Sequence, residues 1–254
     1  MMKTLFIHKR RGRSLSVILE ISSEVKAAFD KLINDVQVKK GLEFIKLDHK
    51  RTVDEQIEIT EIPAPPFKEQ ERAEDFKRRL EELGLEDVTM DAEGNVYGMK
   101  YGTGRGPKVF ISAHLDTVFP EGTDTTVREK DGILYAPGIS DDTRGLAEVL
   151  SIIRAIQEND IRPVGDIIFG ATVGEEGAGD LRGVKAFFKD HHDIDGFISI
   201  DGPTPNHIVY LGTGSYRYKV TYKGPGGHSF GAFGIPSAIH ALGRAIAQIA
   251  DLQT

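Results

Sequence analysis

The sequence contains no cysteine, and its apolar runs are short. Without cysteine there is no disulfide, thiolate zinc ligand or thiol nucleophile, so a metal site must use carboxylates and the eight histidines. No apolar run approaches the ~18 residues of a membrane-spanning helix. The apolar stretch at residues 4–7 precedes a basic segment, which reverses the order found in a secretory signal. We therefore expect a cytoplasmic protein without a membrane partner.

Negatively charged residues outnumber positively charged ones. The chain has 32 lysines and arginines against 39 aspartates and glutamates, for a formal net charge of -7. Nucleic-acid binding draws its affinity from neutralising phosphates, so we expect no nucleic-acid partner. The 39% hydrophobic and 28% charged residues are typical of a globular protein. The 254 residues suffice for one large domain, or for one domain and part of another.

The first part of the chain favours helices. Apolar residues at helical spacing predict an amphipathic helix over about residues 21–39, which we expect to end near Gly41. A second helix is predicted over residues 69–83. Three prolines within residues 63–66 predict a rigid extended turn between the two helices. We assign residues 1–50 to an N-terminal helical extension.

From residue 95 onward, short apolar runs bounded by glycine alternate with helical patterns. This alternation predicts βαβ units and an α/β domain with a central, mainly parallel sheet. We assign this domain to residues 51–211. Its predicted strands and helices lie at about residues 96–101, 109–111, 146–156, 167–169, 181–188 and 197–200.

A second domain is expected to begin at residue 212. Alternating polar and apolar side chains over residues 216–222 predict a half-exposed strand, and an apolar stripe over 239–249 predicts a helix. One strand and one helix are too few for an independent core. We therefore interpret residues 212–254 as the start of an incomplete α+β domain.

Four acidic or histidine-bearing motifs lie at the ends of the predicted elements. They are His114-Leu115-Asp116, Asp141-Asp142, Glu175-Glu176 and Asp201. Three follow predicted strands and the aspartate pair precedes a predicted helix, so all four can meet at the carboxyl edge of the sheet. Taken singly, each motif is more often a turn, a helix cap or a solvated surface. Their repeated placement at one edge favours a common site.

Crowded carboxylates repel one another and take up protons unless a cation compensates them. One histidine with several carboxylates can hold zinc, manganese or cobalt. Two ions sharing a bridging carboxylate would suit hydrolysis, with a carboxylate outside the ligand set accepting a proton from water. Adjacent side chains in Glu175-Glu176 point in different directions, so one can bind metal while the other faces substrate. Asp116 can orient the imidazole of His114.

The motifs resemble those of the dinuclear zinc peptidase family that includes peptidase T, carboxypeptidase G, aminoacylase, acetylornithine deacetylase and succinyl-diaminopimelate desuccinylase. The matching segments, in the same order and spacing, are residues 112–118, 138–145, 172–177 and 201–202. The resemblance implies a three-layer zinc-peptidase-like domain, followed by a lid or dimerisation domain. It also implies two Zn2+ ions per complete active site, with Co2+ or Mn2+ as possible substitutes.

The resemblance implies a role for each residue of the site. The implied metal ligands are His114, Asp141, Glu176 and Asp201. Asp141 would bridge the two ions, and His114 and Asp201 would hold one of them. Glu175 would be the general base, and Asp116 would orient His114.

The second domain carries a further match and two departures. Residues 224–230 are similar to the opening of the family's lid, where His228 would reach the partner subunit's active site and help bind substrate in a homodimer. The family often has lysine at the position of Thr143. Its catalytic domain also resumes after the lid and supplies a last histidine ligand, so we expect this 254-residue chain to be an incomplete member.

The implied function is metal-dependent cleavage of amide bonds in small peptides, by a zinc metallopeptidase of the amino-, di- or tripeptidase type. Two alternatives remain open. One is an N-acyl amino acid deacylase of the same family. The other is a non-catalytic metal-binding remnant, because the last histidine ligand is missing.

Overall fold

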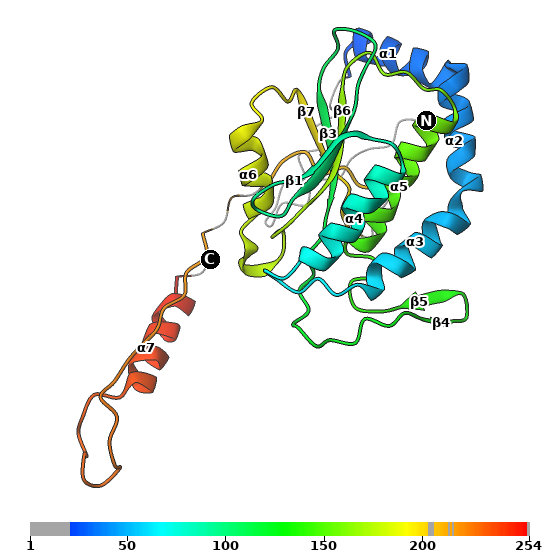
Figure 1. Ribbon diagram of the computed structural model, residues 1–254. Helices are drawn as coiled ribbons and strands as arrows, with labels where there is room; N and C mark the ends of the chain where they lie inside the picture. Colours follow the sequence, from blue (N-terminus) through cyan, green and yellow to red (C-terminus); the bar gives the residue numbers. More distant parts are fainter. Residues whose placement is uncertain (1–20, 203–205, 213, 215, 253–254) are drawn as a thin grey trace. The chain divides into compact units, whose positions relative to one another are not determined.

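The structure is a computed structural model and describes residues 21–202, 206–212, 214 and 216–252 (Figure 1). The chain divides into two units, Met1–Pro205 and Asn206–Thr254. The elements of the first unit are α1 (Ser23–Asn34), α2 (Val36–Leu47), α3 (His49–Glu61), α4 (Gln70–Glu82), β1 (Glu86–Met90), β2 (Val96–Lys100), β3 (Val109–His114), β4 (Arg128–Lys130), β5 (Ile133–Tyr135), α5 (Thr143–Glu158), β6 (Ile167–Thr172), the 3-10 helix η1 (Gly177–Gly179), α6 (Arg182–Asp190) and β7 (Gly196–Ser199).

A five-stranded sheet with the order β1-β2-β6-β3-β7 forms the centre of the first unit (Figure 1). Strand β3 pairs in parallel with both β6 and β7. Strand β2 runs antiparallel to β6, and β1 runs antiparallel to β2. All strands except β2 therefore share one direction, which confirms the predicted α/β class with a mostly parallel sheet. The carboxyl ends of β3, β6 and β7 lie at one edge.

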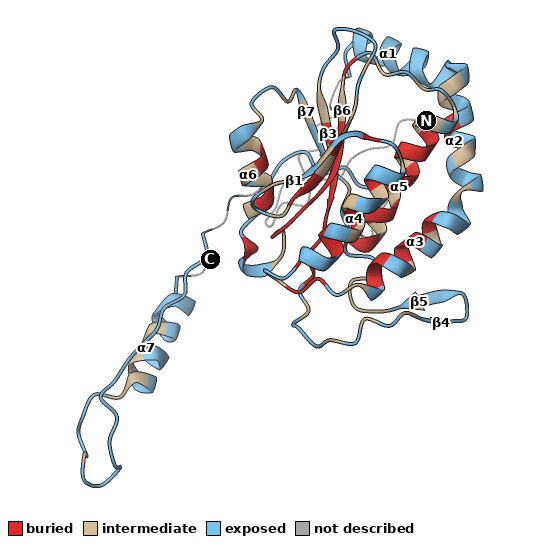
Figure 2. Cartoon of the chain, viewed as in Figure 1, coloured by how far each residue is buried: buried red, intermediate tan, exposed pale blue. Residues whose placement is uncertain are grey.

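Helices cover both faces of the sheet and give three layers (Figure 2). On one face, α3, α4 and α5 contribute buried side chains such as Ile59, Phe76 and Leu150 to the larger apolar core. On the other face, Phe187 of α6 packs against Phe110 of β3 in a smaller core. Strands β3 and β6 are largely apolar on both faces because both of their faces are covered, whereas the edge strand β7 is mostly exposed.

The predicted end of the first helix at Gly41 is wrong. Asp35 separates α1 from α2, because its side chain accepts hydrogen bonds from the backbone N–H groups of Gln37 and Val38 and so caps α2. Gly41 lies buried inside α2, where a Cβ atom would come 2.7 Å from Ile161 Cδ1. The glycine thus permits close packing, and it does not end a helix.

A buried ionic cluster joins α2, α3 and α5. Arg154 of α5 pairs through Nη1 with Glu55 Oε2 at 2.8 Å and through Nη2 with Asp48 Oδ2 at 2.5 Å. Ser151 also donates a hydrogen bond to Asp48. Part of the segment predicted as an N-terminal extension therefore packs into the first unit, against α5.

The second unit contains the helix α7 (Ala238–Ala250). Ser237 caps it by accepting a hydrogen bond from the backbone N–H of His240. The strand predicted over residues 216–222 is not formed. A strand requires a hydrogen-bonded neighbour, and none of the described residues of this unit supplies one. Across the described part of the chain, no helix is both long and apolar enough to cross a membrane.

Candidate functional site

His114 occupies the last position of β3, at the carboxyl edge of the sheet, and its side chain is buried. Its Nδ1 lies 2.9 Å from the backbone oxygen of Asp116, and its Nε2 lies 3.0 Å from Asp141 Oδ1. An Nδ1–H group that donates to this carbonyl leaves Nε2 directed at the carboxylates. This is the arrangement in which histidines commonly bind metal.

Asp142 locks the end of β3 to the start of α5. It is the N-cap of α5 and accepts hydrogen bonds from the backbone N–H groups of Gly145 at 3.2 Å and His114 at 2.8 Å. A Cβ atom at position 145 would lie 2.2 Å from Asp142 Oδ1 and 2.7 Å from the backbone oxygen of Ile200. Glycine is therefore needed for α5 to begin this close to the end of β7.

The carboxylate of Asp116 holds the glutamate pair. It is fully buried, and its two oxygens accept hydrogen bonds from the backbone N–H of Glu175 at 3.1 Å and of Glu176 at 2.8 Å. Its Oδ1 lies 3.7 Å from His114 Nδ1, whereas its backbone oxygen is within hydrogen-bond distance. Asp116 thus contacts His114 mainly through its carbonyl, while its carboxylate positions two further acids. The sequence motif carried no signal of this second contact.

The structure brings the predicted acids together around His114. Two groups of three residues have potential ligand atoms within 4.8 Å of one another: His114 with Glu175 and Glu176, and His114 with Asp142 and Asp201. His114 is the one histidine in either group among the described residues. One imidazole with several carboxylate oxygens suits zinc, manganese or cobalt.

Asp141 and Asp142 differ in what their carboxylates can bind. Asp142, and not Asp141, belongs to the group of ligand atoms within 4.8 Å of one another around His114 and Asp201. Yet both oxygens of Asp142 already accept backbone hydrogen bonds, and this side chain is buried. Asp141 is 51% exposed and places Oδ1 at 3.0 Å from His114 Nε2. The chemistry of the two side chains therefore favours Asp141 as the freer ligand.

The surroundings of His114 stabilise its charged form. Burial alone would lower the pKa of His114, but the hydrogen bond to Asp116 and the charges of nearby carboxylates outweigh it and raise the pKa to about 10. Burial raises the pKa of Asp142 to about 8, although the charge of His114 opposes this. The pKa of Asp116 is lowered, because its hydrogen bonds outweigh the effect of burial.

The glutamate pair is also perturbed. Burial raises the pKa of Glu175 above its usual value, with the charges of Asp201 and Glu176 adding to the effect and His114 opposing it. Burial and the charge of Asp141 raise the pKa of Glu176. Carboxylates that repel one another in this way are a site in which a cation would be stabilised.

Arg72 is a buried residue behind the site, and the sequence analysis did not identify it. This buried residue of α4 donates from Nε and Nη2 to the backbone oxygen of Ile62, at 2.9 and 2.6 Å, and from Nη1 to that of Leu115 at 2.8 Å. It therefore ties the proline-rich turn to the residue before Asp116. Burial lowers its pKa to about 10, an effect that the charge of Asp116 opposes.

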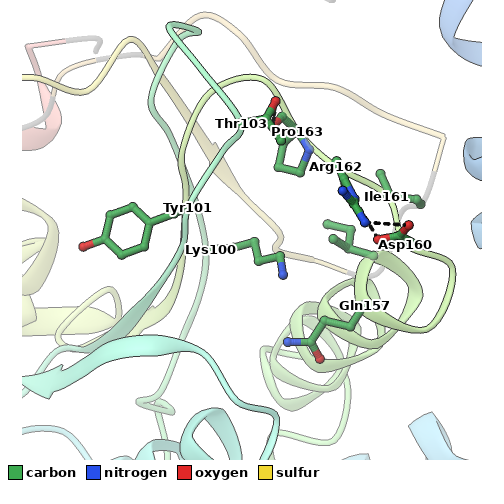
Figure 3. Close-up of a pocket in the computed structure, with 9 residues that line it drawn as sticks. Lys100, Tyr101, Thr103, Gln157, Asp160, Ile161, Arg162 and Pro163 are labelled. Carbon is green, nitrogen blue, oxygen red and sulfur yellow. Dashed lines mark hydrogen bonds and ion pairs between the residues drawn. The ribbon is translucent and has the colours of Figure 1, made fainter.

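The cavity in Figure 3 is separate from the acidic site. It has a volume of about 220 Å³ and is lined by residues from the end of β2, the end of α5 and the segment before β6. It therefore lies at the sheet edge opposite the carboxyl ends of β3 and β6. Its charged groups include Lys100 and the ion pair of Arg162 with Asp160.

His228 belongs to the second unit, where it is exposed. Its Nδ1 accepts hydrogen bonds from the backbone N–H groups of Phe230 and Gly231, at 3.3 and 3.4 Å. Its predicted role in substrate binding stays a prediction. In the first unit, His191 packs against Phe187 and lies 3.2 Å from the hydroxyl of Tyr97, so it takes part in an aromatic cluster.

Residues 110–251 match the family described as Peptidase family M20/M25/M40. The chain is 31% identical to the N-acetylcysteine deacetylase of Bacillus subtilis, over 76% of this chain and 51% of the relative. The aminopeptidase PepT of Bacillus cereus superposes with a TM-score of 0.53 at 28% identity, over 61% of this chain and 44% of that one. A tripeptidase of Staphylococcus aureus does so with a TM-score of 0.51 at 29% identity, with the same coverage. The chain thus spans about half or less of the length of these proteins.

Proposed function

Because the chain belongs to peptidase family M20/M25/M40, we propose that it is a metal-dependent hydrolase that cleaves amide bonds of small peptides. The observation that carries this proposal is the position of His114, whose ring is shared by two groups of carboxylates at the carboxyl edge of the sheet. The likeness to an aminopeptidase and a tripeptidase supports a peptide substrate.

We propose that the complete site holds two divalent ions, Zn2+ with Co2+ or Mn2+ as substitutes. His114 and Asp201 would hold one ion, Glu176 the other, and Asp141 would bridge them. The contact of Asp141 Oδ1 with His114 Nε2 and the electrostatic effect of Asp141 on Glu176 support the bridging role. The ions would polarise the scissile carbonyl and lower the pKa of a bound water.

Glu175 would take the proton from that water and pass it to the leaving amine. It is a suitable general base because its pKa is raised toward the working range by burial and by neighbouring carboxylates. Asp116 would hold Glu175 and Glu176 at fixed positions through their backbone N–H groups. The two neighbouring glutamates can then serve different roles.

A deacylase is the second candidate, supported by the likeness to N-acetylcysteine deacetylase. Both reactions hydrolyse an amide, so the same cluster would serve either one. We further propose that His228 helps bind substrate in a homodimer formed through the second unit, and that the protein acts in the cytoplasm.

The deciding experiment assays the full chain with added Zn2+, Co2+ or Mn2+ against dipeptides, tripeptides and N-acetyl amino acids. We expect hydrolysis of peptides that is abolished by a chelator and restored by metal. Faster cleavage of N-acetyl amino acids would favour the deacylase. Tight metal binding without hydrolysis of any amide would contradict the proposed function and favour a metal-binding remnant.

Glu175→Gln separates the base from the ligands. The variant should lose ~10²–10⁴-fold in kcat, which is the usual contribution of a general base. Its metal content, measured by elemental analysis, should stay at the level of the unmodified chain. Loss of metal along with activity would show that Glu175 is a ligand.

A further inference from the structure

The glutamate pair lies on a loop, Gly174–Leu181, whose backbone is unfavourable in isolation. Gly174 and Gly177 have positive φ angles, which glycine tolerates. Asp180 and Leu181 also have positive φ angles, of 54° and 55°, and neither is glycine. Such residues cost energy and persist only where neighbouring groups hold them. We call this segment the glutamate loop.

Asp116 holds the glutamate loop on the side of the metal cluster, through the backbone N–H groups of Glu175 and Glu176. Arg182, the first residue of α6, directly follows the loop. Its Nε pairs with Glu93 Oε1 at 2.9 Å, and its Nη2 pairs with Glu69 Oε2 at 2.9 Å. These partners come from the turn between β1 and β2 and from the residue before α4.

Arg182 also lies directly against the start of the glutamate loop. A Cβ atom at Gly174 would fall 2.1 Å from Arg182 Nη1 and 2.7 Å from its Cγ. The guanidinium stacks over the ring of Phe67, with Cζ 4.8 Å from the ring centroid. Nη1 is buried, has no hydrogen-bond partner among the described residues and lies against Gly174.

The anchor of Arg182 is itself fixed. Glu69 is buried, and its Oε1 accepts a hydrogen bond from the backbone N–H of Phe67 at 3.0 Å. A guanidinium held in plane by two carboxylates and a ring has little freedom to move. It therefore forms a rigid support for Gly174.

We propose that Arg182 is a positioning residue that keeps Glu175 and Glu176 in place by supporting Gly174, next to the two glutamates that Asp116 holds. This inference rests on the proposed function only where it gives the two glutamates catalytic and metal-binding roles. The mechanical part concerns the loop alone and can be tested without activity.

The test compares Arg182→Met with Arg79→Met by hydrogen–deuterium exchange. Arg79 is a matched control, since it also forms two ion pairs, with Asp75 and Glu58, and its side chain is 11% exposed against 20% for Arg182. Arg79 lies on α4. Among the described residues, its side chain pairs with Asp75 and Glu58 and with no residue of the glutamate loop. Exchange at the amides of Glu175 and Glu176 reports directly on local opening.

We expect Arg182→Met to speed exchange in residues 174–181 by about tenfold or more, the effect of losing one or two charge-assisted hydrogen bonds. Arg182→Lys should lie between this variant and the unmodified chain, because lysine keeps the charge but loses the planar fork. Arg79→Met should leave exchange in the loop unchanged. Should Arg182→Met fail to fold, Arg182→Lys carries the comparison.

A second readout uses the visible absorption spectrum of the Co2+-loaded chain. Arg182→Met should weaken Co2+ binding about tenfold and alter the absorption band, while Arg79→Met should change neither, because 1 Å displacements of ligands matter at such sites. Unchanged exchange in Arg182→Met, or an equal rise in Arg79→Met, would overturn the proposal. Absence of amide hydrolysis in the unmodified chain would contradict the proposed function and leave the exchange result to decide this inference.

Discussion

Asp141 and Asp142 are adjacent in the chain but have different environments. Asp142 is a buried helix cap with both oxygens bound to backbone N–H groups, whereas Asp141 is half exposed beside His114 Nε2. An aspartate pair before a helix is by default a cap, and here one member is a cap while the other contacts His114. The family resemblance assigned the bridging role to Asp141, and the geometry adds that Asp142 is the buried cap.

Alanine variants of the two aspartates should therefore fail in different ways. Asp141→Ala should lose bound metal with little change in thermal stability, because its side chain is half exposed. Asp142→Ala should destabilise the chain by ~1–3 kcal/mol, since two buried N–H groups lose their acceptor. Elemental analysis and thermal unfolding of metal-free protein measure the two effects. The reverse pattern would make Asp142 the bridging ligand.

Metal binding at this site should release protons. The pKa of His114 is raised to about 10 and that of Asp142 to about 8, so without metal both groups hold protons near neutral pH. A metal ion needs unprotonated donors, and its affinity should therefore rise as the pH rises toward these values. Calorimetric titration with Zn2+ in two buffers of different ionisation enthalpy gives the number of protons released. Identical heats in the two buffers would contradict the assigned protonation states.

At the scale of elements, the cluster of Arg154, Asp48 and Glu55 fixes α2 and α3 on α5. The side chain of Arg154 is 2% exposed, so removing it leaves two buried carboxylates without a partner. Arg154→Met should lower the free energy of unfolding by ~3–5 kcal/mol. Arg51→Met is the control, because this 59% exposed residue also pairs with Glu55 and should cost less than ~1 kcal/mol.

Urea unfolding curves measure both changes. If Arg154→Met were as mild as Arg51→Met, α2 would be a loosely attached extension, as the sequence alone suggested. A large difference between the two variants would make α2 and α3 an integral layer of the first unit. The same curves would show whether unfolding stays a single transition.

The central elements could be predicted from the sequence because their signals are local. Glycine-bounded apolar runs predicted β2, β3, β6 and β7, and a long apolar stripe predicted α5. The helix α3 was missed because several of its buried residues are polar. Glu55 pairs with Arg154, Gln56 bonds the backbone oxygen of Ile139, and Thr52 bonds Asp48 at the start of the helix. The short strands β4 and β5 are largely exposed, and three residues each are too few to show a strand period in the sequence.

The sequence also predicted which residues meet at the candidate site, but not the residues that hold them in place. His114, Glu175 and Asp201 could be placed at one edge, because parallel strands bring their carboxyl ends together. The contacts of Arg72 and Arg182 could not be predicted. Arg72 binds the backbone oxygens of Ile62 and Leu115, and Arg182 pairs with Glu69 and Glu93, which are distant in the sequence. A charged residue on an amphipathic helix gives no sign in the sequence that it is buried.

At the scale of the whole molecule, the chain has two units, and the predicted metal ligands all lie in the first. Within the described residues, the two candidate metal groups share a single imidazole. An ion held by His114, Asp201 and the bridging Asp141 has three protein ligands, which suffices for a catalytic zinc site that keeps an open position. An ion held by Glu176 and the same bridge has only carboxylate oxygens.

The two ions should therefore bind with unequal affinity, and the purified 254-residue chain should hold nearer one Zn2+ than two. Zinc prefers nitrogen donors over an all-oxygen set, and one imidazole cannot serve both positions fully. Elemental analysis after dialysis against metal-free buffer gives the ratio, and His114→Ala should bring it close to zero. Two tightly held ions in the unmodified chain would mean that a further histidine, from this chain or from a partner subunit, completes the site.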